Sequence, residues 1–196
     1  LLFPDPNTLS ILPWRPQQGR VVRFFCDIKT PKNENFIYDS RNILKKVIKE
    51  ALSLGYTPQI GTECEFYLFK TDEEGEPTTI THDKGGYLDI APLDKGENIR
   101  REICLCLEEM GIIPESSHHE QGPGQNEIDF KYSDALTAAD NFLTFKATVK
   151  AIASRNGLFA SFMPKPIKNK SGNGLHVNLS LSKNGINIFE NNLIND

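Results

Sequence analysis

The sequence lacks the features that mark membrane-spanning, secreted and nucleic-acid-binding proteins. No apolar run approaches the roughly 20 residues that a helix needs to cross a bilayer. No segment combines the basic start, apolar middle and small-residue cleavage site of a signal peptide. The net charge of -4 offers no general basic face. We therefore expect neither a membrane nor a nucleic acid as partner. The 196 residues, 38% hydrophobic and 24% charged, predict one globular domain with its own core.

Cysteine is scarce, and its spacing is not that of a metal or redox motif. The four cysteines form no C-x-x-C pair; they are Cys26, Cys64, Cys104 and Cys106. Cys26 and Cys64 lie in apolar runs, where an unpaired thiol behaves as a small hydrophobic group. This usage favours a reducing compartment, so we expect a cytoplasmic protein.

The sequence also lacks an initiator methionine and a Walker-type phosphate loop. It starts at Leu1 and stops at Asp196 after the run "GINIFENNLIND", and we interpret it as a piece of a longer polypeptide. Residues 1–18 are rich in proline and are expected to be extended. A bound nucleotide would have to be held by other means than a Walker loop. The segment "KSGNGLH" could present backbone N–H groups to an anion, but a plain turn explains it better when it is read alone.

Hydrophobic periodicity predicts three helices. They are expected at 39–55, 97–111 and 133–157, and a glycine ends each of these segments. Asp39 or Ser40 is expected to cap the first helix, and Ser133 the third.

Short strands lie between these helices. They are expected at 19–29, 61–71, 117–132 (a strand pair), 158–166 and 174–185, with a polar turn at 72–77. This mixed order predicts an α+β or α/β fold, and the turn-rich spacing favours an α+β fold with a largely antiparallel sheet backed by helices.

Three of the predicted strands have one apolar face and one face of potential ligands. Side chains alternate between the two faces of a strand. The expected core faces are Cys64, Phe66 and Leu68; Ile128 and Phe130; and Leu175, Val177, Leu179 and Leu181. The opposite faces are Glu63, Glu65 and Tyr67; Glu127 and Asp129; and His176, Asn178 and Ser180.

Two readings of these polar faces compete. A sheet with one face in water explains any single strand, since antiparallel sheets commonly have one. However, Glu63 and Glu65 repel each other on one face unless a cation lies between them. Glu120 and Glu127, on either side of the turn at 122–124, and His176 are suited to complete such a site. Four carboxylates and an imidazole exceed the needs of one ion, so we predict two divalent ions, Mg²⁺ or Mn²⁺.

Eight segments occur together in the order and spacing of a known family. They are "GRVVRFFCDI", "GTECEFYLF", "GGYLDIAPLD", "RREI", "HHEQGPGQNEIDFKY", "ADNFLTFKATVKAIA", "FASFMPKP" and "GNGLHVNLSL". Over nearly the whole chain this arrangement resembles the catalytic domain of bacterial-type glutamine synthetase. The eight segments together are specific to this family, whereas no single one of them is.

The resemblance implies a fold, a reaction and an assembly. The fold would be a curved antiparallel sheet that forms an active-site funnel. The reaction would be ATP-dependent ligation of ammonia to glutamate through γ-glutamyl phosphate, giving glutamine, ADP and phosphate. The full-length protein would be a homododecamer. Residues 1–18 would be the exit from a missing N-terminal β domain. Residues 19–196 would be a catalytic domain truncated at its C-terminus, and we expect this piece alone to be inactive.

The resemblance also implies roles for individual residues. Glu65, Glu120 and Glu127 would bind the ion nearer the glutamate, and Glu63 and His176 the ion nearer the ATP phosphates. The remaining roles would be an ammonium pocket at Tyr87 and Glu120, amino-acid binding at Gly172 and Ser171, and nucleotide contacts at Glu115, Tyr132, Asn178 and Ser180.

Ser171 departs from the asparagine that the family often has at this position. It leaves open a γ-glutamyl-amine ligase of the same superfamily, which joins glutamate to a larger amine. A non-enzymatic structural or regulatory relative is a further alternative. Loss of metal ligands would indicate it, and the ligands expected in this region are present. A plain metal-binding domain without ligase chemistry is the last alternative, and nucleotide binding would argue against it.

Overall fold

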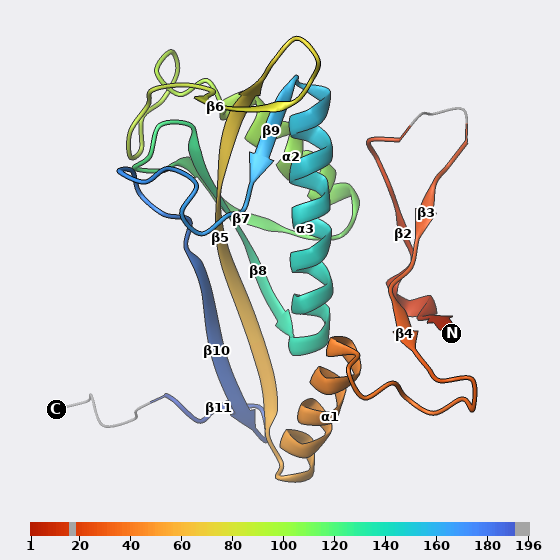
Figure 1. Cartoon of the computed structure of the whole chain (residues 1–196). Helices are drawn as coiled ribbons and strands as arrows, with labels where there is room; N and C mark the ends of the chain where they lie inside the picture. The colour runs from red at the N-terminus through yellow and green to blue at the C-terminus, as the bar shows by residue number, and fades with distance from the viewer. Residues whose placement is uncertain (16–18, 191–196) are drawn as a thin grey trace, which may run out of the picture.

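The computed structural model describes residues 1–15 and 19–190 (Figure 1). Its helices are α1 (Ser40–Ser53), α2 (Glu97–Glu109) and α3 (Ala135–Arg155), with a short 3₁₀ helix at Pro6–Thr8. The strands are β1 (Leu2–Pro4), β2 (Ser10–Ile11), β3 (Val22–Arg23), β4 (Cys26–Ile28), β5 (Thr57–Thr71), β6 (Pro77–Thr81), β7 (Pro114–His119), β8 (Gln125–Asp134), β9 (Leu158–Ser161), β10 (Leu175–Lys183) and β11 (Ile186–Asn187). No helix in the described ranges is long and apolar enough to cross a membrane.

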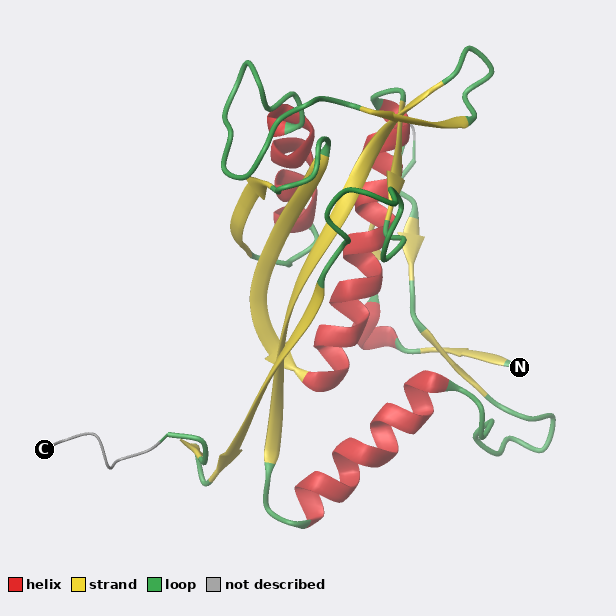
Figure 2. Ribbon diagram, turned by 60° about the vertical axis from the view of Figure 1, so that its left-hand side comes forward, coloured by secondary structure: helices red, strands yellow, loops and turns green. Residues whose placement is uncertain are grey.

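A seven-stranded antiparallel sheet organises the molecule around β5. The strand order is β11-β10-β5-β8-β7, and β6 and β9 also pair with β5. Figure 2 shows the sheet curling rather than lying flat. The predicted α+β class and the curved antiparallel sheet are therefore confirmed.

The core lies between this sheet and the helices α2 and α3, which pack on one of its faces (Figure 1). Its centre is aromatic: Phe145 of α3 lies between Phe66, Phe130 and Phe162, with ring centroids 5.5–6.1 Å apart. As predicted, Cys64, Phe66 and Leu68 of β5 and Ile128 and Phe130 of β8 belong to this core.

The helix ends follow local rules, with one correction. Asp39 caps α1 by accepting a hydrogen bond from the backbone N–H of Arg41 at 3.1 Å. Ser133 does not cap α3, because the helix begins at Ala135 and Asp134 is the residue directly before it. The cap is Asp134, whose carboxylate accepts from the backbone N–H groups of Leu136 and Thr137, both at 3.1 Å. One carboxylate oxygen thus satisfies two free donors of the first turn.

The segment 19–29 is not one strand, as the sequence predicts, but two. β3 pairs with β2 and β4 pairs with β1. Between β3 and β4, the N–H of Phe25 donates to Thr8 Oγ1 and its carbonyl accepts from Asp5 N, each at 2.8 Å. The turn at 5–8 therefore takes the backbone groups that a continuous strand would use. The strand predicted at 61–71 is β5, which begins four residues earlier. The strand β6, which pairs with β5 after the polar turn, was not predicted from the sequence.

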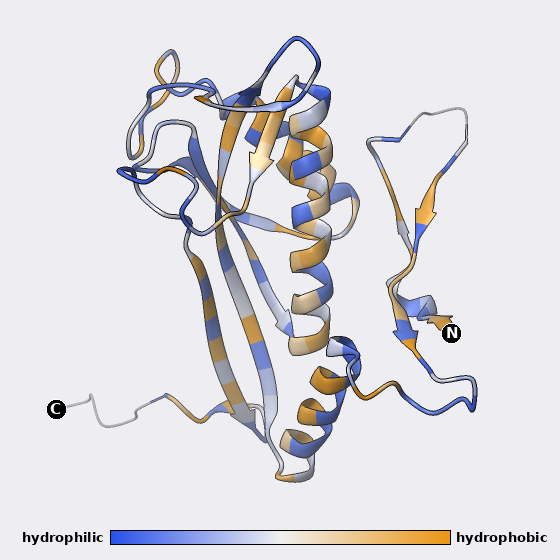
Figure 3. Cartoon of the chain, in the orientation of Figure 1, coloured by the Kyte–Doolittle hydropathy of each residue, from blue (hydrophilic) through white to orange (hydrophobic). Residues whose placement is uncertain are grey.

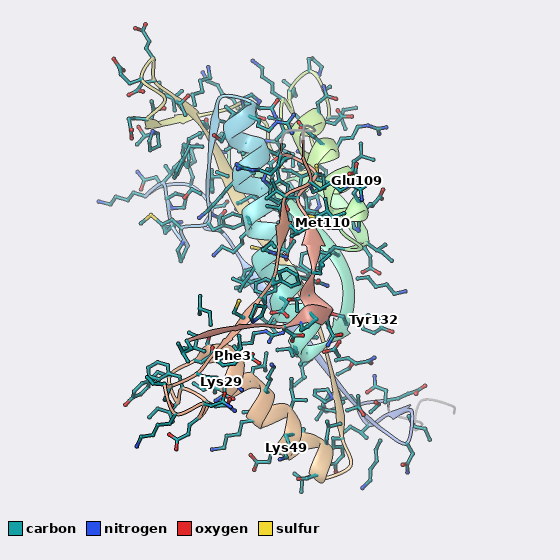
Figure 4. The ribbon with its side chains drawn as sticks, turned by 90° about the vertical axis from the view of Figure 1, so that its right-hand side faces the viewer. Phe3, Lys29, Lys49, Glu109, Met110 and Tyr132 are labelled. Carbon is teal, nitrogen blue, oxygen red and sulfur yellow. The ribbon has the colours of Figure 1, made fainter. Side chains whose placement is uncertain are left out.

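Arg41 fastens the N-terminal segment to the helices. Its guanidinium contacts Asp5, Asp27 and Asp140 at 2.7–2.9 Å and is largely buried. These three carboxylates hold the pKa of Arg41 above its usual value, so the charge persists at any working pH. Within the same segment, Lys29 lies over the ring of Phe3 at 4.5 Å (Figure 4). The division of the chain at residue 18 stays a prediction.

The apolar face of β10 is not part of the core, contrary to the sequence prediction. Leu175, Val177 and Leu179 are 50–60% exposed, and the alternation that suggested burial is visible along β10 in Figure 3. In the described residues α3 packs on β5, β8 and β9 instead. The helix predicted at 39–55 is present as α1. Like the apolar face of β10, its apolar side is not buried, since Ile43 and Val47 are about half exposed.

Phe145→Ala should lower the free energy of unfolding by about 3–5 kcal/mol, because the lost ring leaves a cavity among three other aromatic rings. Leu143→Ala on the same helix is the matched control, since Leu143 is 52% exposed and its loss should change stability by less than about 1 kcal/mol. Urea unfolding followed by circular dichroism measures both. Equal losses would contradict this description of the core.

Candidate metal and nucleotide site

The predicted metal ligands share one face of the sheet. In the antiparallel register His176 of β10 lies opposite Glu63 of β5, and Glu65 lies opposite Glu127 of β8. Cross-strand partners point to the same face, and Glu63 and Glu65 share a face because they are two residues apart on β5. The strand-alternation prediction is therefore confirmed for Glu63, Glu65, Glu127 and His176.

One group of ligand atoms lies at the junction of β5, β8 and β10. The ligand atoms of Glu63, Glu127 and His176 all lie within 4.8 Å of one another. His176 Nδ1 is 3.1 Å from Glu63 Oε2, and Asn178 Nδ2 donates to Glu63 Oε1 at 2.8 Å. Asn178, predicted for the nucleotide, thus holds a carboxylate of the candidate metal site.

A second group lies beside the first and shares Glu127. His118 Nε2 is 2.9 Å from Glu120 Oε1 and 3.2 Å from Glu127 Oε2. His118 is not among the metal ligands predicted from the sequence. Its pairing opposite Glu127 in the β7–β8 register places its ring in the site, and alternation along β7 was the signal that pointed to it.

The carboxyl group of Glu127 is buried and lies close to other carboxyl groups. The residue is 8% exposed. Burial, followed by the charges of Asp129, Glu65 and Glu120 and a hydrogen bond with Glu120, raises its pKa from 4.5 to about 8. A divalent cation in this place would relieve the repulsion, and carboxylate and imidazole donors fit Mg²⁺ or Mn²⁺.

Glu65 belongs to neither of these groups, although the sequence places it with Glu120 and Glu127. Its Oε2 accepts a hydrogen bond from Gln125 Nε2 at 2.5 Å. Its Oε1 faces Gly174, where a Cβ would lie 2.8 Å from it and 3.3 Å from His176 Nε2. Glycine at 174 therefore leaves space in front of two potential ligand atoms.

The turn between Glu120 and Glu127 is held by a buried pair. His119 is fully buried, and its Nδ1 lies 2.6 Å from the Glu120 carbonyl while its Nε2 lies 2.9 Å from Asp83 Oδ1. Asp83 also accepts from Gly124 N at 2.8 Å, and these donors hold its pKa below the usual range despite burial. His119 therefore positions the end of the strand and the turn that follows it.

A cavity of about 260 Å³ adjoins Glu63. Its lining includes all four residues predicted for the nucleotide: Glu115, Tyr132, Asn178 and Ser180. It also includes Thr62 and Asp129, whose buried Oγ1 and Oδ1 atoms have no hydrogen-bond partner. Buried polar atoms without a partner are costly, and an ordered water or a polar atom of a ligand would satisfy each of them. Sequence reasoning did not assign Thr62 or Asp129 to it.

The remaining predicted residues lie around the carboxylates. Tyr87 is 57% exposed, and its ring meets that of His118 edge to face at 5.7 Å. The Ser171 carbonyl accepts from Tyr67 Oη at 2.7 Å, and the Gly172 carbonyl accepts from Gln125 Nε2 at 2.9 Å. The loop at 171–174 is therefore tied to β5 and β8.

A family model described as glutamine synthetase, catalytic domain, matches residues 37–194. The chain belongs to the glutamine synthetase catalytic-domain family. It is 57% identical over 188 residues to a glutamine synthetase of Clostridium saccharobutylicum, covering 96% of this chain and 42% of the relative. It is 50% identical over 185 residues to that of Methanosarcina mazei, covering 94% and 41%.

Solved structures agree with this assignment. Plasmodium falciparum glutamine synthetase matches with a TM-score of 0.86 and 31% identity, over 98% of this chain and 43% of that one. A GmaS/ADP complex matches with a TM-score of 0.86 and 34% identity, over 97% and 44%. The chain thus spans about two fifths of the length of the curated glutamine synthetases it matches.

Mn²⁺ should stabilise this glutamine synthetase domain, and Glu127→Gln should reduce the gain. At a free concentration 100-fold above Kd, binding to the folded state adds about 2.7 kcal/mol, or ~5–10 °C in Tm. Thermal melts with and without Mn²⁺ measure both proteins. If they gain equally, Glu127 is not a ligand.

Without metal, Glu127 should make the domain less stable as pH rises from 4.5 to 8. Its folded pKa lies above its ordinary value, so the folded state binds the proton more tightly. That stabilisation is fully present below the ordinary pKa and is lost as pH rises through the folded pKa. Glu127→Gln should therefore lose less Tm than wild type between pH 5 and pH 8 in EDTA. The exposed Glu73→Gln is the control and should behave like wild type. A Glu127→Gln slope equal to that of wild type would overturn the assignment.

Proposed function

We propose that the full-length protein ligates ammonia to glutamate with ATP, through γ-glutamyl phosphate, and releases glutamine, ADP and phosphate. The observation that carries this proposal is the shared face on which Glu63, Glu65, Glu127 and His176 meet beside a polar cavity. Membership of the glutamine synthetase family supports the same reaction.

Two divalent ions, Mg²⁺ or Mn²⁺, would be held on this face. We assign Glu65, Glu120 and Glu127 to the ion nearer glutamate, and Glu63 and His176 to the ion nearer ATP. When bound, such ions supply positive charge against the phosphate oxygens. The raised pKa of Glu127 and the space kept open by Gly174 support this donor set.

ATP would occupy the cavity lined by Glu115, Tyr132, Asn178 and Ser180. Tyr132 is 54% exposed and offers an aromatic face. Asn178 donates a hydrogen bond to Glu63 at 2.8 Å. A nucleotide held by Asn178 would therefore lie next to Glu63, the carboxylate that we assign to the ion nearer ATP. Thr62 and Asp129 supply further polar atoms to the same cavity.

Glu120 and Tyr87 would form the ammonium pocket. The Glu120 carboxylate attracts NH₄⁺ and can later accept a proton from it. Its contact with His118 holds it in place on one side, and the N–H of Gln121 donates to its other oxygen at 2.9 Å. Gly172 and Ser171 would bind the amino-acid substrate from the neighbouring loop.

The proposed setting is a cytoplasmic homododecamer in which active sites lie between subunits. The four cysteines, all in the described residues, are free, as expected for a reducing compartment. The division into an exit segment at 1–18 and a partial catalytic domain from residue 19 belongs to the same proposal.

Full-length protein should form glutamine from glutamate, ammonia and ATP, while residues 1–196 alone should show no measurable turnover. The reason is that phosphate-binding groups and one metal ligand are expected outside this piece. Release of phosphate together with glutamine is the measurement. Turnover by the 196 residues would contradict the proposal. A clear preference for a polyamine over ammonia would favour the γ-glutamyl-amine ligase that Ser171 leaves open.

A further inference from the structure

Gln125, the first residue of β8, is a fully buried amide at the centre of the site. Its Nε2 donates to Glu65 Oε2 at 2.5 Å and to the Gly172 carbonyl at 2.9 Å. Its Oε1 accepts from Gly122 N at 2.9 Å. One side chain therefore joins β5, the loop at 171–174 and the turn at 122–124.

The neighbours determine which way this amide points. A carboxamide has two N–H donors on nitrogen and an acceptor oxygen. A flipped amide would set its oxygen against the Glu65 carboxylate and the Gly172 carbonyl, and its N–H groups against the N–H of Gly122. The observed orientation satisfies all three partners, and burial makes any loss costly.

The hydrogen bond from Gln125 also determines which oxygen Glu65 presents. Because Oε2 is engaged, Oε1 is the atom left toward Gly174 and His176 Nε2. A carboxylate whose second oxygen is held cannot rotate freely, so its ligand atom is preset before any ion arrives.

Other side chains hold the same loop and form no hydrogen bond with Glu65. Tyr67 Oη donates to the Ser171 carbonyl at 2.7 Å, and Asn173 Nδ2 donates to the Ser161 carbonyl at 3.1 Å. Gln125 differs from these, since the same nitrogen bonds both Glu65 and the Gly172 carbonyl.

We propose that Gln125 is a positioning residue that couples the ligand geometry of Glu65 to the backbone of the amino-acid-binding loop at Gly172. Binding of a divalent cation at Glu65 and binding of glutamate at the loop are then linked through one amide. The roles of Glu65 and Gly172 in this inference rest on the proposed function.

The test compares Gln125→Met with Tyr67→Phe in the full-length enzyme. Methionine matches glutamine in length but cannot make the three hydrogen bonds of Gln125. Tyr67→Phe removes a hydrogen bond to the same loop and no hydrogen bond to Glu65. Mn²⁺ alone is the metal probe, with free Mn²⁺ counted by electron paramagnetic resonance. Steady-state kinetics give KM for glutamate and for ATP.

Gln125→Met should weaken Mn²⁺ binding about tenfold or more and raise KM for glutamate by a similar factor, with KM for ATP changed less than about twofold. Tyr67→Phe should leave Mn²⁺ affinity within about twofold. Glu65→Gln should add little to the metal defect of Gln125→Met, because both act on one ligand.

Unchanged Mn²⁺ affinity in Gln125→Met, or equal weakening in Tyr67→Phe, would overturn the inference. If Gln125→Met does not fold, Gln125→Asn takes its place, since its shorter amide cannot reach Glu65 and Gly122 together. Wild type that binds Mn²⁺ but makes no glutamine would refute the proposed function, and the Mn²⁺ comparison would still decide the role of Gln125.

Discussion

The pleat of β5 is the constraint on which the rest of this structure depends. Along 15 residues this strand pairs with β10, β8, β6 and β9. Its alternate residues go either under α3, as Phe66 does, or onto the opposite face, as Glu63 and Glu65 do. A register shift of one residue would exchange the two sets, so burial of the core also fixes the position of the carboxylates.

Gathering acids on one face has an electrostatic cost, and the neighbouring groups offset part of it. Glu127 keeps its proton to an unusually high pH, while His118 lies between Glu120 and Glu127. Asn178 and Gln125 donate to the two carboxylates of β5. Hydrogen bonds that fix the carboxylates in this way are the kind of support that a preorganised ligand set requires.

The turn at 122–124 connects this electrostatic arrangement to the fold. A Cβ on Gly122 would lie 1.9 Å from Tyr67 Oη, and Gly124 has a φ of +69°. The turn therefore packs closer to β5 than any other residue type permits. Asp83 and His119 then anchor it from the buried side, so the spacing of Glu120 and Glu127 is set by packing rather than by the turn alone.

The sequence alone was enough to predict which side chains share a face, where the first helix begins and where the third ends. These features depend on local geometry: the two-residue period of a strand placed Glu63 with Glu65, and cap chemistry placed Asp39 and Gly157. The resemblance to the glutamine synthetase family, which rests on many short segments in order, also predicted a reaction. The positions of His118 and Gln125 beside the carboxylates, and the exposure of Val177, could be learned only from the folded chain. These outcomes depend on the register between strands distant in sequence and on what packs over each face, and neither is encoded in a local pattern.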